Sequence, residues 1–254
     1  MYVSSQFTDQ GQNGRPGTSP ATLGWSPAGL SRSTPPAPRR DEALALAALD
    51  GAATTLCVEK DRTIFVEGDR AEFCYRILGG TVRMVKQMAD GRRHVTGFLL
   101  AGELVGLDAM DRHDLTAETV MSTTLTRYKR AAVEALADRD PIVARRLRLL
   151  AAGELRAAHE RMVLLGRRTA SERLAHFLLE MEARAPRGGC GRVVLPMGRA
   201  DIADHLGLTP ETVCRLLTCL RHEGTIGTSR AVDGAEVTIL DPRALAALAS
   251  DPRH

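Results

Sequence analysis

The sequence that decides the fold of the C-terminal part reads RADIADHLGLTPETVCRLLTCLRHEG and spans residues 199 to 224. In its first half Ile202, Ala203 and Leu206 fall on one face of a helix, and the small alanine lets a second helix cross closely. Gly207 follows directly and can adopt the positive φ with which many helices end. The stretch therefore begins with a short helix that stops at this glycine.

A second helix is expected directly after the turn. Thr209 is a favoured N-cap residue, and Pro210 suits the first helical position because a backbone N–H is not needed there. Apolar residues then recur at helical spacing, at Val213, Leu216, Leu217 and Leu220. They form a stripe that can pack back on the first helix.

The outer face near the start of this second helix is polar. It carries Thr209, Glu211, Thr212, Cys214 and Arg215. A recognition helix contacts base edges in the major groove with its N-terminal residues. Arg215 can donate to guanine O6 and N7 and Glu211 can accept from cytosine N4, each good contact discriminating by about 1 to 3 kcal/mol. We interpret the stretch as a helix-turn-helix that reads DNA. The alternative is a helical hairpin with a solvated charged face.

Length and composition are those of a globular protein with room for two domains. The chain has 254 residues, of which 26% are charged and 44% hydrophobic. Its net charge of +3 is too small to indicate a nucleic-acid partner by itself, because a useful field needs a local patch. Neither a long apolar run nor a signal-peptide pattern is present, so we expect no membrane partner and a cytoplasmic location.

The cysteine pattern argues against a disulfide framework. The five cysteines are Cys57, Cys74, Cys190, Cys214 and Cys219. They lack the close CxxC spacing of zinc and redox sites, and their odd number favours free thiols. We expect no metal site and no bound cofactor.

Composition changes along the chain and predicts separate parts. Residues 1–40 hold six of the twelve prolines and few apolar residues, which is typical of a disordered tail. Residues 41–138 contain short apolar runs separated by turn signals, of which Asp90-Gly91 is the strongest hairpin signal. This second part is predicted to be an antiparallel all-β module.

The hydrophobic period becomes helical in the next part, residues 139–166. The apolar stripe of this long helix includes Leu147, Ala151, Leu155, Ala158, Met162 and Leu165. The spacing is that of a coiled-coil seam and indicates a dimerisation helix for a homodimer. The alternative is a helix packed on its own domain.

Residues 167–254 form the last part, a winged helix-turn-helix DNA-binding domain. An amphipathic helix at 169–183 precedes the helix-turn-helix, and two short strands around Asp233-Gly234 and a last helix at 241–250 follow it. The expected fold class is α+β, with an N-terminal antiparallel β-roll, a long dimerisation helix and a C-terminal winged helix-turn-helix.

Three segments carry a resemblance to a known family. They read GFLLAGELVGLDAM at residues 97–110, RRTASERLAHFLLEM at 167–181 and RADIADHLGLTPETVCRLL at 199–217. With the order of the parts, they resemble the CRP/FNR superfamily of bacterial transcription regulators, and its FNR and FixK branch more than its cyclic-AMP receptor branch. The resemblance covers about residues 55–250 and implies a β-roll of the cyclic-nucleotide-binding type.

The recognition helix of this family carries a Glu-x-x-Ser-Arg pattern that reads a TTGA-type half-site. This chain matches the pattern at Glu211 and Arg215, with Cys214 in place of the serine. The resemblance therefore implies a homodimer on a palindrome of double-stranded DNA. It also implies contact with RNA polymerase and activation of genes of oxygen-limited or nitrogen-related metabolism.

The resemblance argues against a cyclic nucleotide as the signal. Relatives that bind cyclic AMP use a Gly-Glu pair followed by an arginine that holds the phosphate. Gly102-Glu103 is present here, but the matching stretch at residues 114–117 lacks the arginine. A cyclic phosphate would lose a charge-assisted contact.

An FNR-type iron–sulfur cluster is also not expected, because it needs cysteines near the N-terminus and residues 1–56 contain none. The alternative function is an effector-dependent regulator with an unidentified ligand in the β-roll. That ligand would be a small metabolite, or a haem held by His94 or His113.

Cys214 is a candidate redox switch. The field at the helix N-terminus and the neighbouring Arg215 favour its thiolate, the form that is oxidised. A sulfenic or sulfinic acid would add bulk or negative charge beside the DNA and weaken binding. The alternative is a near-isostere that merely stands in for serine. Cys219 is expected to point toward the apolar side.

Other function classes fit the sequence less well. The chain contains no phosphate loop, nucleophile elbow or HExxH motif, so we expect no enzyme activity. A ligand-binding protein that does not read DNA would fit the first half of the chain, but it leaves Glu211 and Arg215 unexplained.

Overall fold

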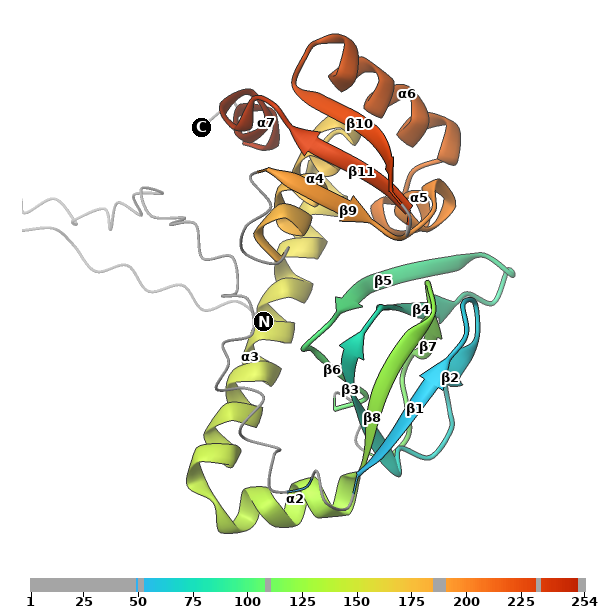
Figure 1. Cartoon of the computed structure of the whole chain (residues 1–254), viewed down its shortest axis with the longest axis vertical. Helices are drawn as coiled ribbons and strands as arrows, with labels where there is room; N and C mark the ends of the chain where they lie inside the picture. Colours follow the sequence, from blue (N-terminus) through green and yellow to red (C-terminus); the bar gives the residue numbers. More distant parts are fainter. Residues whose placement is uncertain (1–48, 50–52, 108–110, 185–190, 232–233, 251–254) are drawn as a thin grey trace, which may run out of the picture. The chain divides into compact units, whose positions relative to one another are not determined.

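The computed structural model describes residue 49 and residues 53–107, 111–184, 191–231 and 234–250. The chain divides into two units, and all described residues belong to the second, Thr34–His254. The tail predicted for residues 1–40 lies outside the described residues. Figure 1 shows the order of the elements in this second unit.

The predicted β-roll is confirmed as two four-stranded antiparallel sheets (Figure 1). One sheet has the order β1 (Thr54–Val58), β8 (Thr123–Lys129), β3 (Phe73–Gly79) and β6 (Leu104–Val105). The other has the order β2 (Thr63–Phe65), β7 (Thr116–Thr119), β4 (Thr81–Gln87) and β5 (Arg93–Leu100). The β4–β5 hairpin turns at the predicted Asp90-Gly91, where Gly91 has φ 84°.

The interior of the roll is filled by apolar side chains from both sheets. They are Phe65, Tyr75, Ile77, Val82, Met84, Val105, Ala117 and Leu125. β-branched and aromatic residues are favoured on such packed sheet faces. Burial of these side chains is the main stabilising contribution within the roll.

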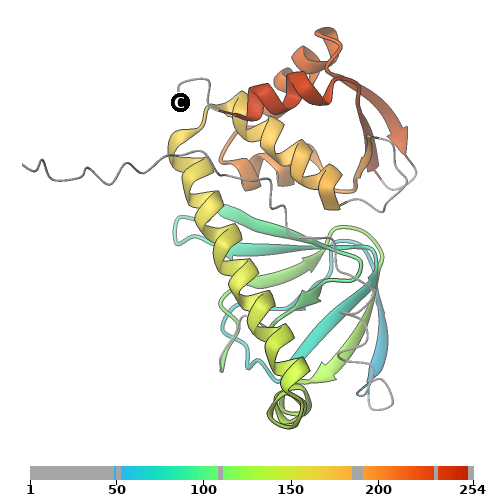
Figure 2. The same cartoon turned by 90° about the vertical axis from the view of Figure 1, so that its left-hand side faces the viewer.

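Two helices follow the roll. They are α2 (Arg130–Arg139) and α3 (Pro141–Arg167). The Asp140 side chain accepts a hydrogen bond from the Ile142 N–H, and Pro141 occupies the first turn, so the start of α3 is capped. Figure 2 shows α3 running past the roll toward the C-terminal elements. Among the described helices none is long and apolar enough to cross a bilayer.

The C-terminal elements form the predicted winged helix-turn-helix. Their order is α4 (Ala170–Arg184), β9 (Arg192–Leu195), α5 (Arg199–Leu206), α6 (Pro210–His222), β10 (Ile226–Ala231), β11 (Gly234–Ile239) and α7 (Pro242–Ala249). The strands make a sheet of order β10-β11-β9. Strand β9 was not predicted, and Asp233 of the predicted turn lies outside the described residues.

One apolar core extends from the roll into the C-terminal elements. Val85, Val95, Phe98 and Val120 of the roll belong to the same buried cluster as residues of α4, α5 and α6. Helix α5 therefore packs against β5 of the roll. The predicted boundaries at residues 138 and 166 stay predictions.

Candidate DNA-binding site

The turn between α5 and α6 ends α5 as predicted. Gly207 has φ 62° and ψ 43°, the left-handed conformation that glycine adopts without a Cβ clash. The N–H groups of Gly207 and Leu208 both donate to the carbonyl of Ala203. The α5 C-terminus is thereby closed, and the chain turns directly into α6.

Thr209 caps the N-terminus of α6 as predicted. Its hydroxyl accepts from the Thr212 N–H at 3.2 Å and lies 3.1 Å from the Thr212 hydroxyl, while Pro210 occupies the first turn. These bonds fix the first turn of the helix. The backbone N–H of Glu211 and the Thr209 hydroxyl lower the pKa of the Glu211 carboxyl, which therefore stays charged.

Helix α6 has one buried face and one exposed face. Val213, Leu217 and Leu220 are buried in the core. On the other side Glu211, Cys214, Arg215 and Thr218 are exposed, and Thr212 is half-buried. The structure thus brings the predicted polar residues together on the surface of the first two turns.

Thr218 also lies on this exposed face, and it was not among the predicted DNA-binding residues. It lies three residues after Arg215 and seven after Glu211, which places all three along one helical stripe. Its hydroxyl donates to the Cys214 carbonyl at 2.9 Å. The spacing from Glu211 was the signal that would have identified it.

The two cysteines of α6 are both exposed free thiols. The expectation that Cys219 points to the apolar side is wrong. The buried stripe runs through Val213, Leu217 and Leu220, and position 219 lies outside it. The Cys219 thiol donates to Glu223 at 3.1 Å, and this bond raises the pKa of Cys219.

The β10–β11 hairpin forms a wing, and Glu236 of β11 links its two strands to β9 through hydrogen bonds. Glu236 accepts from Ser229 at 2.7 Å and from Arg192 Nε at 2.7 Å. These two donors lower the pKa of Glu236. Arg230 lies next to Ser229 on β10 and is exposed, as a residue that contacts a DNA phosphate must be.

Arg173 of α4 fastens the helix-turn-helix to the end of α3. Its Nη1 donates to the Leu206 carbonyl at 2.9 Å, and its Nη2 donates to the Leu165 carbonyl at 2.8 Å. Its Nε donates to the Arg168 carbonyl at 3.0 Å. One guanidinium therefore satisfies carbonyls at the C-terminal ends of both α3 and α5.

The predicted dimerisation residues do not share one environment. Leu155 and Met162 are 59% and 70% exposed, and Ala151 is exposed too. Leu147, Ala158 and Leu165 are half-buried, and Leu147 packs against a cluster that contains Tyr128. The other large apolar residues exposed on α3 are Ile142, Leu149 and Val163.

Glu103, the acidic residue of the Gly-Glu pair that cyclic-AMP-binding relatives use, is engaged within the chain. Glu103 Oε2 accepts from the Leu100 N–H at 2.9 Å and from Arg184 Nη2 of α4 at 2.8 Å. The ring of His113, one of the two proposed haem ligands, stacks on Phe65 with centroids 3.6 Å apart. Among the described residues no group of His, Cys, Asp and Glu side chains is arranged to hold a metal ion.

Comparison with protein families matches both halves of the chain. Residues 55–140 match the cyclic nucleotide-binding domain, and residues 172–248 match the Crp-like helix-turn-helix domain. The two matches correspond to the β-roll and to the winged helix-turn-helix described above.

Individual relatives are transcription regulators, not enzymes. The nitrogen fixation regulation protein FixK of Bradyrhizobium diazoefficiens is 40% identical over 190 residues, covering 74% of this chain and 78% of that protein. The transcriptional activatory protein AadR of Rhodopseudomonas palustris is 38% identical and covers 74% and 77%. The structure of FixK2 from Bradyrhizobium japonicum has a TM-score of 0.73 at 41% identity, covering 78% of this chain and 98% of that one. The chain therefore belongs to the CRP/FNR superfamily of DNA-binding transcription regulators, in its FixK branch.

Proposed function

We propose that the chain activates transcription as a homodimer that binds a TTGA-type palindrome, with Glu211 and Arg215 reading each half-site. The observation that carries this proposal is the exposed face of α6, where a charged carboxylate and a guanidinium lie one helical turn apart. Both side chains are exposed to solvent.

The chemistry of this pair suits the one G·C pair of a TTGA half-site. A guanidinium donates to O6 and N7 of guanine, and a carboxylate accepts from N4 of cytosine. Thr209, Thr212 and Cys214 lie around the pair and are proposed to contact the neighbouring backbone or bases. Arg221 and Arg230 are also exposed and are suited to phosphate contacts.

A second copy is proposed to bind along α3. The exposed apolar side chains Leu155 and Met162 belong to the predicted seam, and Ile142, Leu149 and Val163 extend the exposed apolar surface along the helix. Apolar residues repeated over a helix of 27 residues favour helix pairing. A two-fold dimer would place its recognition helices in successive major grooves of a palindrome.

The regulated process is proposed from the relatives. FixK is named for regulation of nitrogen fixation and AadR for transcriptional activation. We propose that this chain activates genes of oxygen-limited or nitrogen-related metabolism through contact with RNA polymerase. This proposal invokes no ligand or cofactor.

The proposal is tested by measuring the affinity of the reduced protein for a duplex that carries a TTGA palindrome. A scrambled duplex and the Arg215→Ala variant are measured alongside. We expect tight, sequence-dependent binding without added ligand, and a loss of about 1 to 3 kcal/mol in discrimination for the variant. Specific binding that appears only after an effector is supplied would instead support the effector-dependent regulator.

A further inference from the structure

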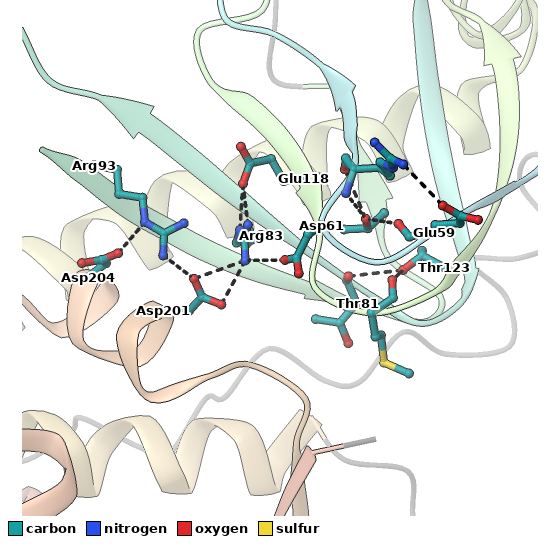
Figure 3. Close-up of polar contacts among 12 residues, drawn as sticks. Glu59, Asp61, Thr81, Arg83, Arg93, Glu118, Thr123, Asp201 and Asp204 are labelled. Carbon is teal, nitrogen blue, oxygen red and sulfur yellow. Dashed lines mark hydrogen bonds and ion pairs between the residues drawn. The ribbon is translucent and has the colours of Figure 1, made fainter. Parts of the chain in front are cut away.

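A cluster of charged side chains joins the β4–β5 hairpin to α5, the first helix of the DNA-reading unit (Figure 3). Arg83 Nη1 lies 3.1 Å from Asp201 Oδ2, and Arg93 Nη2 lies 2.7 Å from Asp201 Oδ1. Arg93 Nε also donates to Asp204 at 2.7 Å. Two guanidinium groups of the roll thus hold two carboxylates on one helix.

The centre of the cluster is buried. Asp201 is 6% exposed, and the Arg83 side chain is 11% exposed. Glu118 lies 2.8 Å from both Nε and Nη2 of Arg83, so the remaining nitrogen, Nη1, faces Asp201 and also Asp61 at 3.3 Å. A guanidinium fixed in this way presents its remaining donors in one direction, so the contact specifies an orientation of α5.

Backbone contacts add a second constraint along β5. His205 Nδ1 donates to the Val95 carbonyl at 2.9 Å, and His94 Nδ1 donates to the Asp204 carbonyl at 2.8 Å. The His205 ring also lies between Phe98 and Phe177, at centroid distances of 5.3 and 5.7 Å. These reciprocal bonds fix the position of α5 along the strand as well as its rotation.

Docking on the roll leaves the reading face of α6 accessible. The docking contacts use Asp201, Asp204 and His205 of α5, whereas Glu211 and Arg215 of α6 are exposed in the same structure. Among the described residues, docking and reading therefore use different side chains. The docked arrangement is compatible with DNA binding.

We propose that Arg83 and Arg93 are positioning residues for DNA binding, which hold the helix-turn-helix against the β-roll in the orientation that a palindrome requires. This inference rests on the proposed function, because it concerns how the same site is presented to DNA. A reading unit released from the roll must be ordered again when it binds, and this ordering reduces affinity. The β-roll then determines the orientation in which the helix-turn-helix meets the DNA.

The test exchanges the charges of the half-exposed pair Arg93–Asp204. Arg93→Asp and Asp204→Arg are made singly and together in the full-length chain, and the affinity for the TTGA palindrome is measured well below the melting temperature. We expect each single variant to bind roughly tenfold more weakly. The double variant should bind about threefold more tightly than Arg93→Asp without reaching the affinity of the unaltered chain, because the introduced carboxylate still lies against Asp201. Hydrogen exchange of the α5 amides should rise in the single variants and fall again in the double variant.

A matched control separates docking from a change of charge. Arg92→Asp alters the same charge at the next residue of the hairpin, where Arg92 pairs with the exposed Asp90. It should leave affinity within about twofold, because a surface pair of this kind contributes little. If a reversed charge prevents folding, Arg93→Gln is used in place of Arg93→Asp. It should also bind DNA more weakly than the unaltered chain, whereas the control Arg92→Asp should not.

The outcomes separate this inference from the proposed function. An unaltered chain without specific binding overturns the proposed function. Specific binding by the unaltered chain with equal affinity in all variants overturns the positioning role. So does a single variant that binds more tightly, since docking would then oppose DNA binding. So does a folded double variant that binds no more tightly than Arg93→Asp.

Discussion

The two helices of the helix-turn-helix present polar side chains in opposite ways. On α6 the charged Glu211 and Arg215 are exposed to solvent. On α5 the charged Asp201 is buried and paired with two arginines of the roll. A buried charge must be compensated inside the molecule, whereas an exposed one stays available to an outside partner. The α6 surface is therefore suited to recognition and the α5 surface to fixing geometry.

Removing Arg83 should lower the stability of the fold more than any other change considered below. Arg83→Ala leaves the buried Asp201 with Arg93 as its remaining ion-pair partner and removes the guanidinium that pairs with Glu118. Loss of one partner from such a cluster typically lowers stability by about 3 to 5 kcal/mol. Chemical denaturation should show this fall in the free energy of unfolding. Arg62→Ala, which breaks an exposed pair with Glu59, should change it by less than about 1 kcal/mol. An equal fall in the free energy of unfolding of the two variants would show that the buried ion pairs contribute no more than the exposed one, contrary to this prediction.

The buried His205 predicts a loss of stability in acid. Burial lowers the pKa of His205 from 6.5 to about 4, the Val95 carbonyl and Glu180 opposing this shift and Arg161 and His94 adding to it. The unfolded chain then takes up a proton below pH 6.5 while the folded chain does not. Stability from this group is complete above pH 6.5 and falls as pH drops toward 4, by about 3 kcal/mol in total.

This contribution is measured as the difference between the unaltered chain and His205→Gln in denaturant titrations from pH 7 to pH 4. The glutamine variant lacks the titrating group, so its stability should fall less steeply over this range. Parallel pH profiles would show that His205 is not the group responsible.

Oxidation is expected to act on the exposed reading surface. Peroxide treatment should weaken specific DNA binding roughly tenfold through Cys214, because an oxidised sulfur adds bulk or charge at the contact surface. Burial raises the pKa of Cys74 to about 11, so this thiol should stay reduced. Cys214→Ser should remove the sensitivity and Cys219→Ser should keep it. Sensitivity that survives in the Cys214 variant would place the effect elsewhere.

Loss of the N-cap of α6 should have a modest effect on stability. Thr209→Ala removes the hydroxyl that accepts from the Thr212 N–H and should lower the free energy of unfolding by about 1 kcal/mol. Thr218→Ala removes an exposed hydroxyl bonded to a carbonyl of its own helix and should change it by less than about 0.5 kcal/mol. Thermal denaturation of both variants compares a cap with a mid-helix threonine on the same helix.

The helices could be predicted because their signals are local. Gly207, Thr209 and Pro210 mark the turn, and the apolar stripe of α6 from Val213 to Leu220 extends over about two turns. Short or polar strands gave no such signal. Strand β6 has two residues, and β7 reads TAET, so neither shows an alternation that distinguishes it from a loop.

The reading residues were also accessible from sequence, since they follow from the helical spacing and the motif. The docking contacts were not. Arg83 and Asp201 are 118 residues apart, and nothing in the sequence around either residue identifies the other as its partner. The prediction for Cys219 was wrong because this residue lies beside the apolar stripe of α6. A small error in the direction assigned to such a stripe is enough to make an exposed position look buried.

The three bonds of Arg173 have a mechanical consequence for the dimer proposed above. Because one guanidinium is bonded to the last turn of α3 and to the last turn of α5, a rotation of α3 about its own axis would be transmitted to α5, the helix that precedes the recognition helix α6. The orientation of α3 and the orientation of the helix-turn-helix are then coupled through Arg173. In a dimer built on α3, the pitch of the helix pair sets the distance between the two recognition helices, and with it the spacing of half-sites that the protein accepts.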